Sequence, residues 1–419
     1  MKNIETKTVD CCASPGLISV EQATEKILSQ ASPVEETESV DVLDALNRVL
    51  AEDLHSTIDV PGYDNSAMDG YAVRSDDCQA SGSELPVSQR IPAGQVGSFL
   101  EAGTAARIFT GAPIPEGADA VVMQEMCDAL NNGKGENKVK INTVVKAGAN
   151  VRRAGEDIAS GSTVLKAGKR LRPQELGLLA SVGLAEIKVK RKLKVATFFT
   201  GDEIITPGQA LAAGQIYNSN RYTLTGLLQA MDCEIVDLGI VPDTLEATLD
   251  VLQKAAASAD MVITSGGVSV GEEDYVRIAL EKLGQLTMWR IAMKPGKPVA
   301  FGKVNNALFM GLPGNPVSVF VTFLLFARSL ILKQQGVEDC FVKRVSVIAD
   351  FDWPQIKRQE YLRVRLLEKD KQMVAQLFSH QGSGVLSSAS WADGLIEVSI
   401  GQAIKEGDKV SYLPFEGLY

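Results

Sequence analysis

The sequence predicts a multidomain protein in which a doubly wound α/β domain is joined to separate β domains. The chain has 419 residues, which is more than one hydrophobic core usually supports. From residue 193 to residue 336, short apolar runs alternate with amphipathic helical segments, a pattern typical of a mostly parallel sheet covered by helices. Residues 56–157 and the chain after residue 336 show brief apolar runs between dense turn signals, so we expect β structure there, with a small C-terminal barrel or sandwich.

The segments on either side of the first β region are expected to be helical. Apolar residues recur at helical spacing in Ile18–Gln30, with Ser19 as a candidate N-cap, and again in Val40–Leu54. A further helix is expected at Pro173–Ser181, because proline suits the first helical position. Since helices precede and follow the β region, we expect that region to be inserted into an elongated first domain.

The α/β region is expected to contain six strands and four helices. The strands are expected at Lys194–Phe199, Glu234–Ile240, Met261–Thr264, Met288–Ala292, Val299–Gly302 and Ala307–Met310. The helices are expected near Ser219–Met231, Leu245–Ser258, Asp274–Leu283 and Pro316–Lys333. Open sheets of this kind bind ligands at the carboxyl ends of their strands.

Charge and composition argue against several classes of function. The formal net charge is −10 and the isoelectric point is near 5.0, which argues against binding to nucleic acid or to an anionic membrane. The six cysteines show no C-x-x-C spacing and the chain has only two histidines, so a zinc or iron–sulfur site is not expected. Scattered cysteines suit reduced thiols in a cytoplasm.

Export and membrane insertion are not expected either. The first 18 residues are acidic and polar and lack the apolar stretch of a signal peptide. The longest apolar run, Val317–Leu332, is interrupted by polar residues and is too short to span a bilayer, so we expect a buried helix there. These features predict a soluble, cytoplasmic protein.

Three glycine-rich turns follow short apolar runs in the second half of the α/β region. They read SGGVSVGEED from Ser265, KPGKP from Lys294 and GLPGNPVS from Gly311. Backbone amides of such turns can approach an anion closely. In KPGKP, two prolines restrict the loop that carries Lys294 and Lys297. The turns therefore predict a site for a phosphorylated ligand, and the alternative is that the lysines are simply solvated.

The third turn has the features of a helix start. Asn315 is a candidate N-cap and Pro316 suits the first helical position, so the amides of Val317 and Ser318 and the Ser318 hydroxyl would face an anion. The alternative is a helix start without a ligand.

Carboxylates also follow the strands of the α/β region. Glu203 lies after the first strand, Asp243 after the second, and Asp274 follows the SGG turn. Such carboxylates could hold Mg²⁺ against a bound pyrophosphate. The alternative is that Asp243 and Asp274 cap helices, a common use of aspartate.

The β regions carry polar motifs that remain ambiguous by themselves. Asp64–Val73, Thr110–Pro113 and Arg152–Asp157 could be functional or could be ordinary turns and a salt-bridged surface loop. Near the C-terminus, Arg363 and the loop Gln381–Gly384 offer a guanidinium and another group of backbone amides. P-loop and dinucleotide-binding motifs are absent from the sequence.

Together these motifs carry a family resemblance. PGYDNSAMDGYAV, FTGAPIPEGADAVVMQE, RRAGEDI, TGDE, SGGVSVGEEDY, KPGKPVAFG, GLPGNPVS and HQGSGVLSS occur in the order seen in the molybdopterin molybdenumtransferases (MoeA), a family related to the gephyrin E domain. The chain resembles this family from about Ile18 to its C-terminus. It departs from the usual pattern at Arg290, where some members have lysine, and at Tyr361, where phenylalanine is more usual.

The resemblance implies a fold, a reaction and an assembly. It implies an elongated homodimer with a MogA-like α/β domain, an inserted β domain, an elongated helical and β linker domain, and a C-terminal β-barrel. Members insert molybdenum from molybdate into adenylylated molybdopterin and release AMP in a Mg²⁺-dependent step. Their active cleft lies between the α/β domain of one subunit and the β domains of the other. A MogA-type adenylyltransferase and molybdoenzyme-maturation proteins are the implied partners.

The resemblance also implies domain boundaries and site residues. The implied division is a disordered N-terminus at 1–17, the linker domain at 18–55 and 162–192, the inserted β domain at 56–161, the α/β domain at 193–336 and the barrel at 337–419. Catalytic positions correspond to Asp69, Thr110, Asp157, Glu203, Asp243 and Asp274, of which Asp243 and Asp274 would bind the metal. Substrate-binding positions correspond to Ser265, Gly266, Gly267, Lys294, Lys297, Pro298, Pro313, Pro316, Ser318, Arg363 and Ser383.

Two other functions remain open at this point. A MogA-like domain could transfer an adenylyl group from ATP to molybdopterin, although appended β domains favour insertion of the metal. A gephyrin-like scaffold without catalysis is the other alternative, and the retained lysines and carboxylates argue against it.

Overall fold

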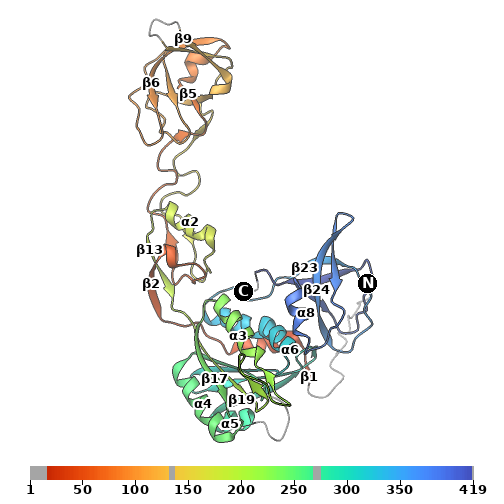
Figure 1. Ribbon diagram of the computed structural model, residues 1–419. Helices are drawn as coiled ribbons and strands as arrows, with labels where there is room; N and C mark the ends of the chain where they lie inside the picture. Colours follow the sequence, from red (N-terminus) through yellow and green to blue (C-terminus); the bar gives the residue numbers. More distant parts are fainter. Residues whose placement is uncertain (1–16, 132–136, 268–274, 418–419) are drawn as a thin grey trace, which may run out of the picture.

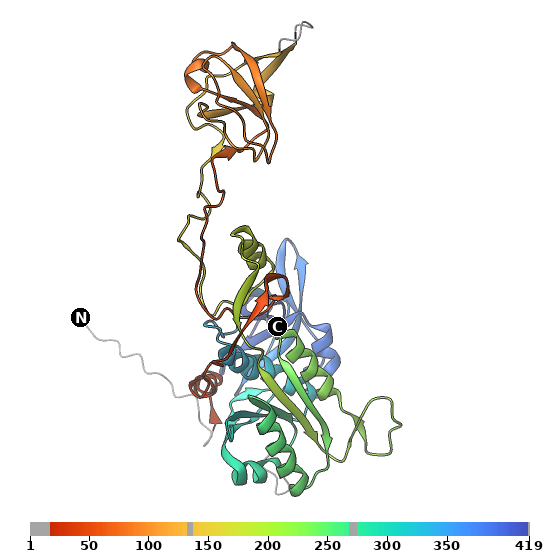
Figure 2. The ribbon, with the colours of Figure 1, turned by 90° about the vertical axis from the view of Figure 1, so that its left-hand side faces the viewer.

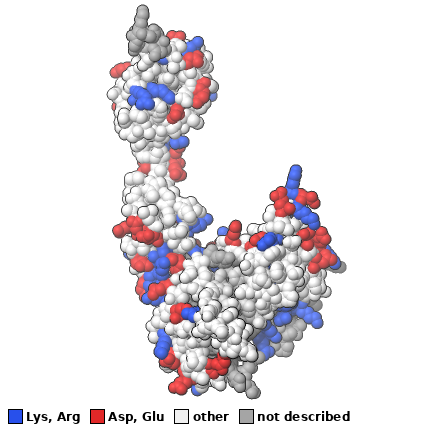
Figure 3. Space-filling model, in the orientation of Figure 1, with Lys and Arg blue, Asp and Glu red and all other residues white. Residues whose placement is uncertain are grey.

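The computed structural model describes residues 17–131, 137–267 and 275–417. The molecule is elongated: the α/β sheet and the C-terminal barrel form a broad body, and a slender linker joins this body to a β domain at the far end (Figures 1 and 2). Over the face drawn in Figure 3, acidic and basic side chains are interspersed rather than gathered into one large patch.

The α/β sheet has seven strands, and all but one run in the same direction. In spatial order they are β1 (Leu17–Ile18), β19 (Gly284–Ile291), β21 (Pro298–Val304), β22 (Ala307–Leu312), β18 (Met261–Ser265), β14 (Lys194–Thr200) and β17 (Glu234–Val241). Only β21 is antiparallel to its neighbours. The mostly parallel sheet predicted from the sequence is therefore confirmed, with β1 as an additional edge strand.

Helices cover both faces of this sheet, as a doubly wound fold requires. On one face lie α1 (Val20–Ser29), α3 (Ser219–Ala230), α6 (Pro316–Thr322) and α7 (Arg328–Gln334). On the other face lie α4 (Leu245–Ser258) and α5 (Tyr275–Leu283). Each helix buries a stripe of Leu, Val and Ala against the strands, and this apolar burial is the main stabilising contribution.

The most apolar helix lies in the centre of the body. A five-residue π-helical stretch, Phe323–Ala327, joins α6 to α7, so that Pro316–Gln334 forms one continuous helix of 19 residues. An 18-residue window of this helix has a mean hydropathy of 1.7. By length and composition the helix could cross a membrane, so the expectation that it is too short is wrong, but 83% of that window is buried inside the protein. Burial in the core accounts for its apolar composition, as expected from the sequence.

The N-terminal segment packs on the α/β sheet rather than on the linker. β1 pairs with β19, and Val20, Ala23 and Ile27 of α1 are buried in the same core as α7. A capping box between Ser19 and Gln22 starts α1. The sequence had assigned the chain from residue 18 to the linker. The structure differs because the apolar face of α1 is buried against the body.

The linker is built from two antiparallel strand pairs and one helix. β2 (Thr37–Asp41) pairs with β13 (Glu186–Lys190), and β3 (Leu54–His55) pairs with β12 (Thr163–Leu165). The helix α2 spans Pro173–Ser181, as predicted. Segments on both sides of the β region thus meet, which agrees with an insertion.

The prediction of a helix at Val40–Leu54 is wrong. Its first two residues belong to β2, and only a short 3₁₀ turn, Val42–Asp44, is helical. Asn47 then adopts a φ of 67°, which ends any right-handed helix. The apolar spacing arises because Leu50 and its neighbours contact the distant strand β13 and fill the small linker core.

Glu175 is expected to make the stability of the linker depend on pH. Its carboxylate accepts hydrogen bonds from Arg172 Nη2 at 2.6 Å and Nε at 3.0 Å and lies 3.4 Å from Lys169 Nζ. These bonds from Arg172 lower the Glu175 pKa from 4.5 to about 2. The ionised form is therefore favoured by folding, and its stabilisation is present above pH 4.5 and lost as the pH falls towards 2.

We expect Glu175→Gln to lower the free energy of unfolding by about 1–2 kcal/mol at pH 7. The difference from the wild type should shrink below pH 4.5. Urea unfolding followed by circular dichroism at several pH values measures it, with the exposed Glu246→Gln as control. A deficit of constant size down to pH 2.5 would contradict this assignment.

The β domain at the far end contains a six-stranded sheet. Its strands in spatial order are β8 (Ala120–Met123), β5 (Gly70–Val73), β7 (Ala105–Ile108), β6 (Ser83–Ile91), β10 (Asn137–Ile141) and β9 (Cys127–Asn131). Small apolar residues fill two separate clusters on this sheet. A short pair of β4 (Asn65–Ser66) and β11 (Val151–Arg152) joins the sheet to the linker. The inserted β domain predicted from the sequence is confirmed.

The C-terminal region forms a closed β-barrel. Its strands are β24 (Gln359–Lys369), β25 (Gln372–Leu377), β23 (Val345–Ala349), β27 (Lys409–Pro414) and β26 (Gly394–Val398), and β26 pairs with β24 to close the ring. The Tyr361 hydroxyl, which phenylalanine would lack, donates to Glu397 Oε1 at 3.1 Å, and the Tyr361 side chain is buried in the core that the barrel shares with the α/β body. A helix, α8 (Leu386–Trp391), and the strand β20 (Met293–Lys294) connect the barrel with the α/β body.

Candidate functional site

A cleft lies where the carboxyl ends of the α/β strands face a loop of the barrel. Two adjoining cavities, of about 270 and 330 Å³, share Gly296, Asn315 and Ser318 in their walls. The three glycine-rich turns identified in the sequence all contribute to these walls. The remaining lining residues come from the barrel loop after β25 and from Arg358.

The loop between β20 and β21 is held in place from both sides. β20 pairs with β24 of the barrel, and Lys294 Nζ lies 3.1 Å from Glu360 Oε1. Gly296 has a φ of +104°, and a Cβ there would lie 2.5 Å from Thr322 Cγ2 of α6. Only glycine fits this position without strain. The ion pair leaves the Lys294 side chain 47% exposed, so its charge faces the cleft mouth as well as Glu360.

The first turn of α6 meets the barrel loop directly. The backbone amide of Val317 donates to the carbonyl of Ser383 at 3.0 Å. The sequence had assigned this amide to an anion, but the barrel loop already uses it. Ser318 is 3% exposed and lines both cavities, so its remaining exposed surface faces the cleft. Asn315 precedes the helix as predicted, although its side chain makes no capping bond.

Arg363 supports the barrel loop from inside the protein. It is 1% exposed, and its guanidinium donates to Ser388 Oγ at 3.0 Å, to Tyr361 O at 3.3 Å and to Gly382 O at 3.1 Å. Gln381 exchanges two hydrogen bonds with the Arg363 backbone. Burial lowers the Arg363 pKa to about 10, so the side chain stays charged at neutral pH. Arg363 thus holds the loop that carries Ser383 and does not itself line either cavity.

The glycine turn after β18 forms the floor of the larger cavity. The Gly266 amide donates to Leu312 O at 3.1 Å, and a Cβ on Gly267 would lie 2.7 Å from Val276 Cγ2. Ser265 is buried within β18 at 5% exposure. The turn therefore brings backbone, rather than the Ser265 side chain, to the cleft.

The cleft brings together seven of the eleven substrate-binding positions that the resemblance implied. These are Gly266, Gly267, Lys294, Pro298, Pro313, Ser318 and Ser383. The other four do not line the two cavities: Ser265 and Arg363 are buried, Lys297 is exposed beside the loop, and Pro316 is the first residue of α6.

Two polar residues at the cleft were not identified from the sequence. Arg358 lines the smaller cavity and lies in a barrel loop without a recognisable pattern. Asn220, in the first turn of α3, donates from Nδ2 to Gly314 O at 2.7 Å, and its buried Oδ1 has no hydrogen-bond partner within the described chain. Its position after the short strand β16 (Ile216–Tyr217), at a helix start, was the only available signal.

The carboxylates expected to bind a metal follow neighbouring strands of the sheet. Glu203 follows β14, just before β15 (Ile204–Ile205), and Asp243 follows β17, which pairs with β14 in parallel. Asp274 lies outside the described residues. Within the described chain, no group of three or more His, Cys, Asp and Glu side chains is close enough to hold a metal. Two carboxylates from adjacent strand ends still suit Mg²⁺, which usually binds one or two carboxylates together with substrate phosphate.

A second polar cluster lies in the β domain. Asp69 Oδ1 accepts hydrogen bonds from the Thr110 amide at 2.8 Å and from the Thr110 hydroxyl at 2.7 Å. These bonds lower the Asp69 pKa. Arg107 lies over the ring of Phe109 beside this pair and donates to Gly70 O at 2.7 Å. The two motifs that carry Asp69 and Thr110 therefore lie side by side in the folded chain.

Asp157 and the β-domain pair lie away from the cleft within one chain. Asp157 is exposed near the base of the β domain, where its amide donates to Val60 O at 3.1 Å. Figure 1 shows β5, which begins next to Asp69, at the opposite end of the molecule from α6. The two groups of residues therefore do not meet in the single chain.

An interdomain cleft lined by glycine turns, a lysine and hydroxyls is typical of a multidomain enzyme with a small anionic ligand. Three family models match the chain in order: the MoeA N-terminal region (domains I and II) over residues 18–183, a probable molybdopterin binding domain over 196–333 and the MoeA C-terminal region (domain IV) over 346–415. A molybdopterin molybdenumtransferase of Haemophilus influenzae is 47% identical over 323 residues, covering 76% of this chain and 78% of that protein. The chain belongs to the molybdopterin molybdenumtransferase (MoeA) family.

Other relatives agree with this assignment. A molybdopterin molybdenumtransferase of a Nostoc species is 43% identical over 322 residues, covering 74% of this chain and 73% of that protein. Gephyrin of Dictyostelium discoideum is 34% identical over 77% of this chain, which spans only 50% of that protein. The crystal structure of a molybdopterin biosynthesis MoeA protein from Pyrococcus horikoshii matches 95% of this chain and all of that chain, with a TM-score of 0.80 and 30% identity.

Proposed function

We propose that this chain inserts molybdenum from molybdate into adenylylated molybdopterin, with Mg²⁺-dependent release of AMP, in molybdenum cofactor biosynthesis. The chain is an enzyme that transfers molybdenum, as its relatives are. The proposal of molybdate and adenylylated molybdopterin as substrates is supported by one observation: Lys294, Ser318 and Ser383 meet three glycine turns in one cleft.

The small cavity suits molybdate, which is a compact tetrahedral dianion. Lys294 and Arg358 supply positive charge there, and Ser318 and Ser383 contribute hydroxyl donors. The adjoining cavity around Gly266, Gly267 and Pro313 suits the pterin phosphate, because backbone at such turns can come close to phosphate oxygens. The dithiolene would then lie between the two cavities, next to the incoming oxyanion.

Adenylate hydrolysis requires neutralisation of phosphoryl charge and activation of a water. Bound Mg²⁺ would supply the charge neutralisation. Glu203, Asp243 and Asp274 are the candidates for holding it and for taking the proton of the attacking water. Asp69, Thr110 and Asp157 would approach from a second subunit, and Thr110 keeps Asp69 ionised through two hydrogen bonds.

We further propose that the chain acts as a homodimer, because the β-domain residues lie far from the cleft of their own chain (Figure 1). We also propose that the homodimer is cytoplasmic. The domain division proposed for the chain is that given by the sequence, except that residues 17–29 are assigned to the α/β body on which they pack. A MogA-type adenylyltransferase would supply the adenylylated substrate, and maturation proteins would accept the product.

Removing the lysine or the hydroxyl of the small cavity should impair the use of molybdate. We expect Lys294→Gln and Ser318→Ala to lower molybdate-dependent AMP release at least tenfold, with a higher molybdate concentration needed for half-maximal rate. The assay measures AMP after mixing enzyme, adenylylated molybdopterin, Mg²⁺ and molybdate. Lys254→Gln, which removes an exposed charge on α4, is the control. Unchanged molybdate dependence in both cleft variants would argue against the proposed molybdate site.

Adenylyl transfer is the second candidate reaction, because the α/β domain matches a molybdopterin binding domain. Incubation of the protein with molybdopterin, ATP and Mg²⁺ distinguishes the two reactions. Formation of adenylylated molybdopterin would contradict the proposal, and its absence together with molybdate-dependent AMP release would support it.

A further inference from the structure

Two arginines and two aromatic side chains form a row across one face of the β-domain sheet. Arg107 of β7 is the register partner of Arg90 in β6 and of Tyr71 in β5, and the side chains of register partners point to the same face of a sheet. The centroid of the Phe109 ring lies 4.6 Å from the guanidinium carbon of each arginine. The Tyr71 ring lies 5.3 Å from the guanidinium carbon of Arg107. We call these four residues the stacking row.

The two arginines of the stacking row are held in different ways. Arg107 is half-buried, and its guanidinium donates to Gly70 O at 2.7 Å and to Gln124 Oε1 at 2.7 Å. Arg90 is exposed and forms no hydrogen bond or ion pair with the described residues. Arg107 is therefore fixed in place beside the Phe109 ring, whereas the guanidinium of Arg90 keeps its N–H donors and its exposed surface for a ligand.

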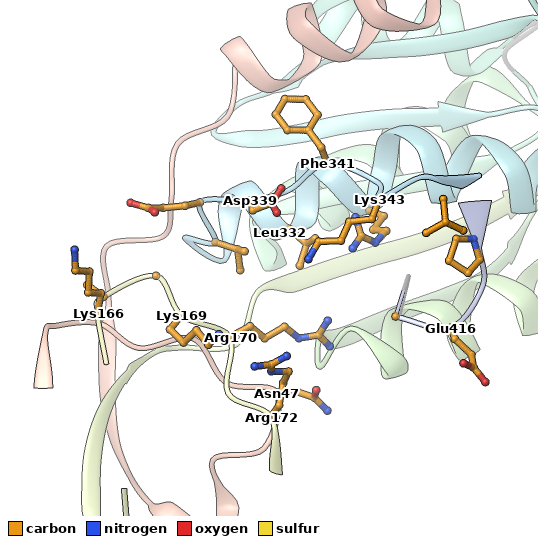
Figure 4. Close-up of a pocket in the computed structure, with 18 residues that line it drawn as sticks. Asn47, Lys166, Lys169, Arg170, Arg172, Leu332, Asp339, Phe341, Lys343 and Glu416 are labelled. Atoms are coloured by element: carbon orange, nitrogen blue, oxygen red, sulfur yellow. The ribbon is translucent and has the colours of Figure 1, made fainter. Parts of the chain in front are cut away.

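The stacking row places like charges side by side, which destabilises a sheet unless another group compensates for them. Other clustered arginines of this acidic chain have a nearby carboxylate. They line the largest cavity of the described chain, of about 770 Å³, between the linker and the barrel (Figure 4). There the charge of Asp232 acts on Arg170 and that of Asp339 acts on Arg328. Arg90 differs from them because it has no carboxylate at ion-pair distance among the described residues.

The stacking row borders the Asp69–Thr110 pair. Phe109 immediately precedes Thr110 in the chain. Gln124 connects the two groups, because its amide donates to Asp69 O at 3.0 Å and its side-chain Oε1 accepts from Arg107 Nη2 at 2.7 Å. A ligand of nucleotide size that reaches the Asp69–Thr110 pair therefore also reaches the stacking row.

We propose that the stacking row binds the adenine base of the adenylylated substrate held in the cleft of the partner subunit. This inference rests on the proposed function and on the proposed homodimer. Guanidinium planes and aromatic rings stack on nucleobases, and Arg90 and Phe109 offer both kinds of surface. The proposed function places the pterin phosphate on the glycine turns of the α/β domain. The adenosine joined to that phosphate then extends away from these turns, towards the β domain of the other subunit.

Equilibrium dialysis of the full chain with AMP, and separately with molybdopterin, tests this site. We expect Arg90→Gln and Phe109→Leu to raise the dissociation constant of AMP about tenfold and to leave that of molybdopterin unchanged. Arg90→Lys keeps the charge but lacks the planar guanidinium, so it should raise the AMP value about fivefold. Two controls in the same domain should change neither value: Phe99→Leu, at another exposed phenylalanine, and Lys138→Gln, at an exposed charge on β10.

Arg90 is exposed, so its variants decide the question if Phe109→Leu does not fold. Unchanged AMP binding in Arg90→Gln would overturn the proposal, and molybdate-dependent AMP release by the wild type would show that the proposed function stands without it. Wild-type affinity in Arg90→Lys but not in Arg90→Gln would also overturn it, since a charge contact with phosphate would then replace stacking.

Two further outcomes separate the base site from its alternatives. If the variants of the stacking row weakened the binding of molybdopterin instead of AMP, the pterin would occupy this place and the proposal would be wrong. If they weakened AMP binding although the wild type showed no molybdate-dependent AMP release, the adenine site would be supported and the proposed function alone would fail.

Discussion

Replacing Arg363 with methionine should destabilise the barrel and weaken molybdate binding together. The guanidinium is 1% exposed and serves three acceptors, the Tyr361 and Gly382 carbonyls and Ser388 Oγ. Methionine fills much of the same volume but leaves these acceptors without a donor, at a cost of about 3 kcal/mol in the free energy of unfolding. Urea unfolding followed by tryptophan fluorescence measures this, because Trp353 and Trp391 both belong to the barrel region.

The functional effect of Arg363→Met is expected to be indirect. Without the bond to Gly382 O, the loop that carries Ser383 loses a constraint, so the molybdate dissociation constant should rise at least tenfold. Faster amide hydrogen exchange at residues 382–384 distinguishes positioning from direct contact. If exchange there were unchanged while molybdate binding was lost, Arg363 would instead contact the anion itself. Arg365→Met is the matched control, because Arg365 lies in the same strand as Arg363 and its guanidinium stacks on Trp391 of α8.

The parts of the cleft that could be predicted from the sequence lie at one edge of the α/β sheet. Parallel strands end at a common edge, so the turns at Gly266 and Gly314 had to be neighbours once the strand–helix alternation was recognised. The same reasoning placed Glu203 and Asp243 after adjacent strands. In these cases the local pattern of the sequence is sufficient, because each residue follows its own strand by one to three positions.

The parts that could not be predicted depend on contacts between distant segments. Ser383 accepts a hydrogen bond from Val317, 66 residues earlier, and nothing local to either residue indicates this contact. Arg358 reaches the cleft only because β20 joins the barrel strand β24. Leu50 fits a helical spacing in the sequence, but in the structure it pairs with Val189, on the other side of the inserted domain in the chain. Apolar spacing records that a residue is buried, but it does not record the partner.

A heterodimer carrying one defect in each subunit should regain half of the wild-type activity. Asp69→Asn removes the acceptor of the two Thr110 bonds in the β domain, and Lys294→Gln removes the lysine of the cleft. Each variant alone should be nearly inactive as a homodimer. In a mixed dimer with clefts formed between subunits, one cleft contains both intact residues and the other contains both defects, so about half of the activity returns.

Co-expression with two different affinity tags and sequential purification isolates the mixed dimer, and molybdate-dependent AMP release measures its activity. The physical reason for expecting recovery is the length of the linker: within one chain the Asp69–Thr110 pair and the cleft lie at opposite ends of the molecule (Figure 1). If each cleft were instead completed within one chain, both clefts of the mixed dimer would contain one defect. The mixed dimer would then be as inactive as its parents, and the assignment of Asp69 and Thr110 to the partner's cleft would have to be abandoned. The control is a mixed dimer with both substitutions in the same subunit, which leaves each of the two intersubunit clefts with one defect and should therefore remain inactive.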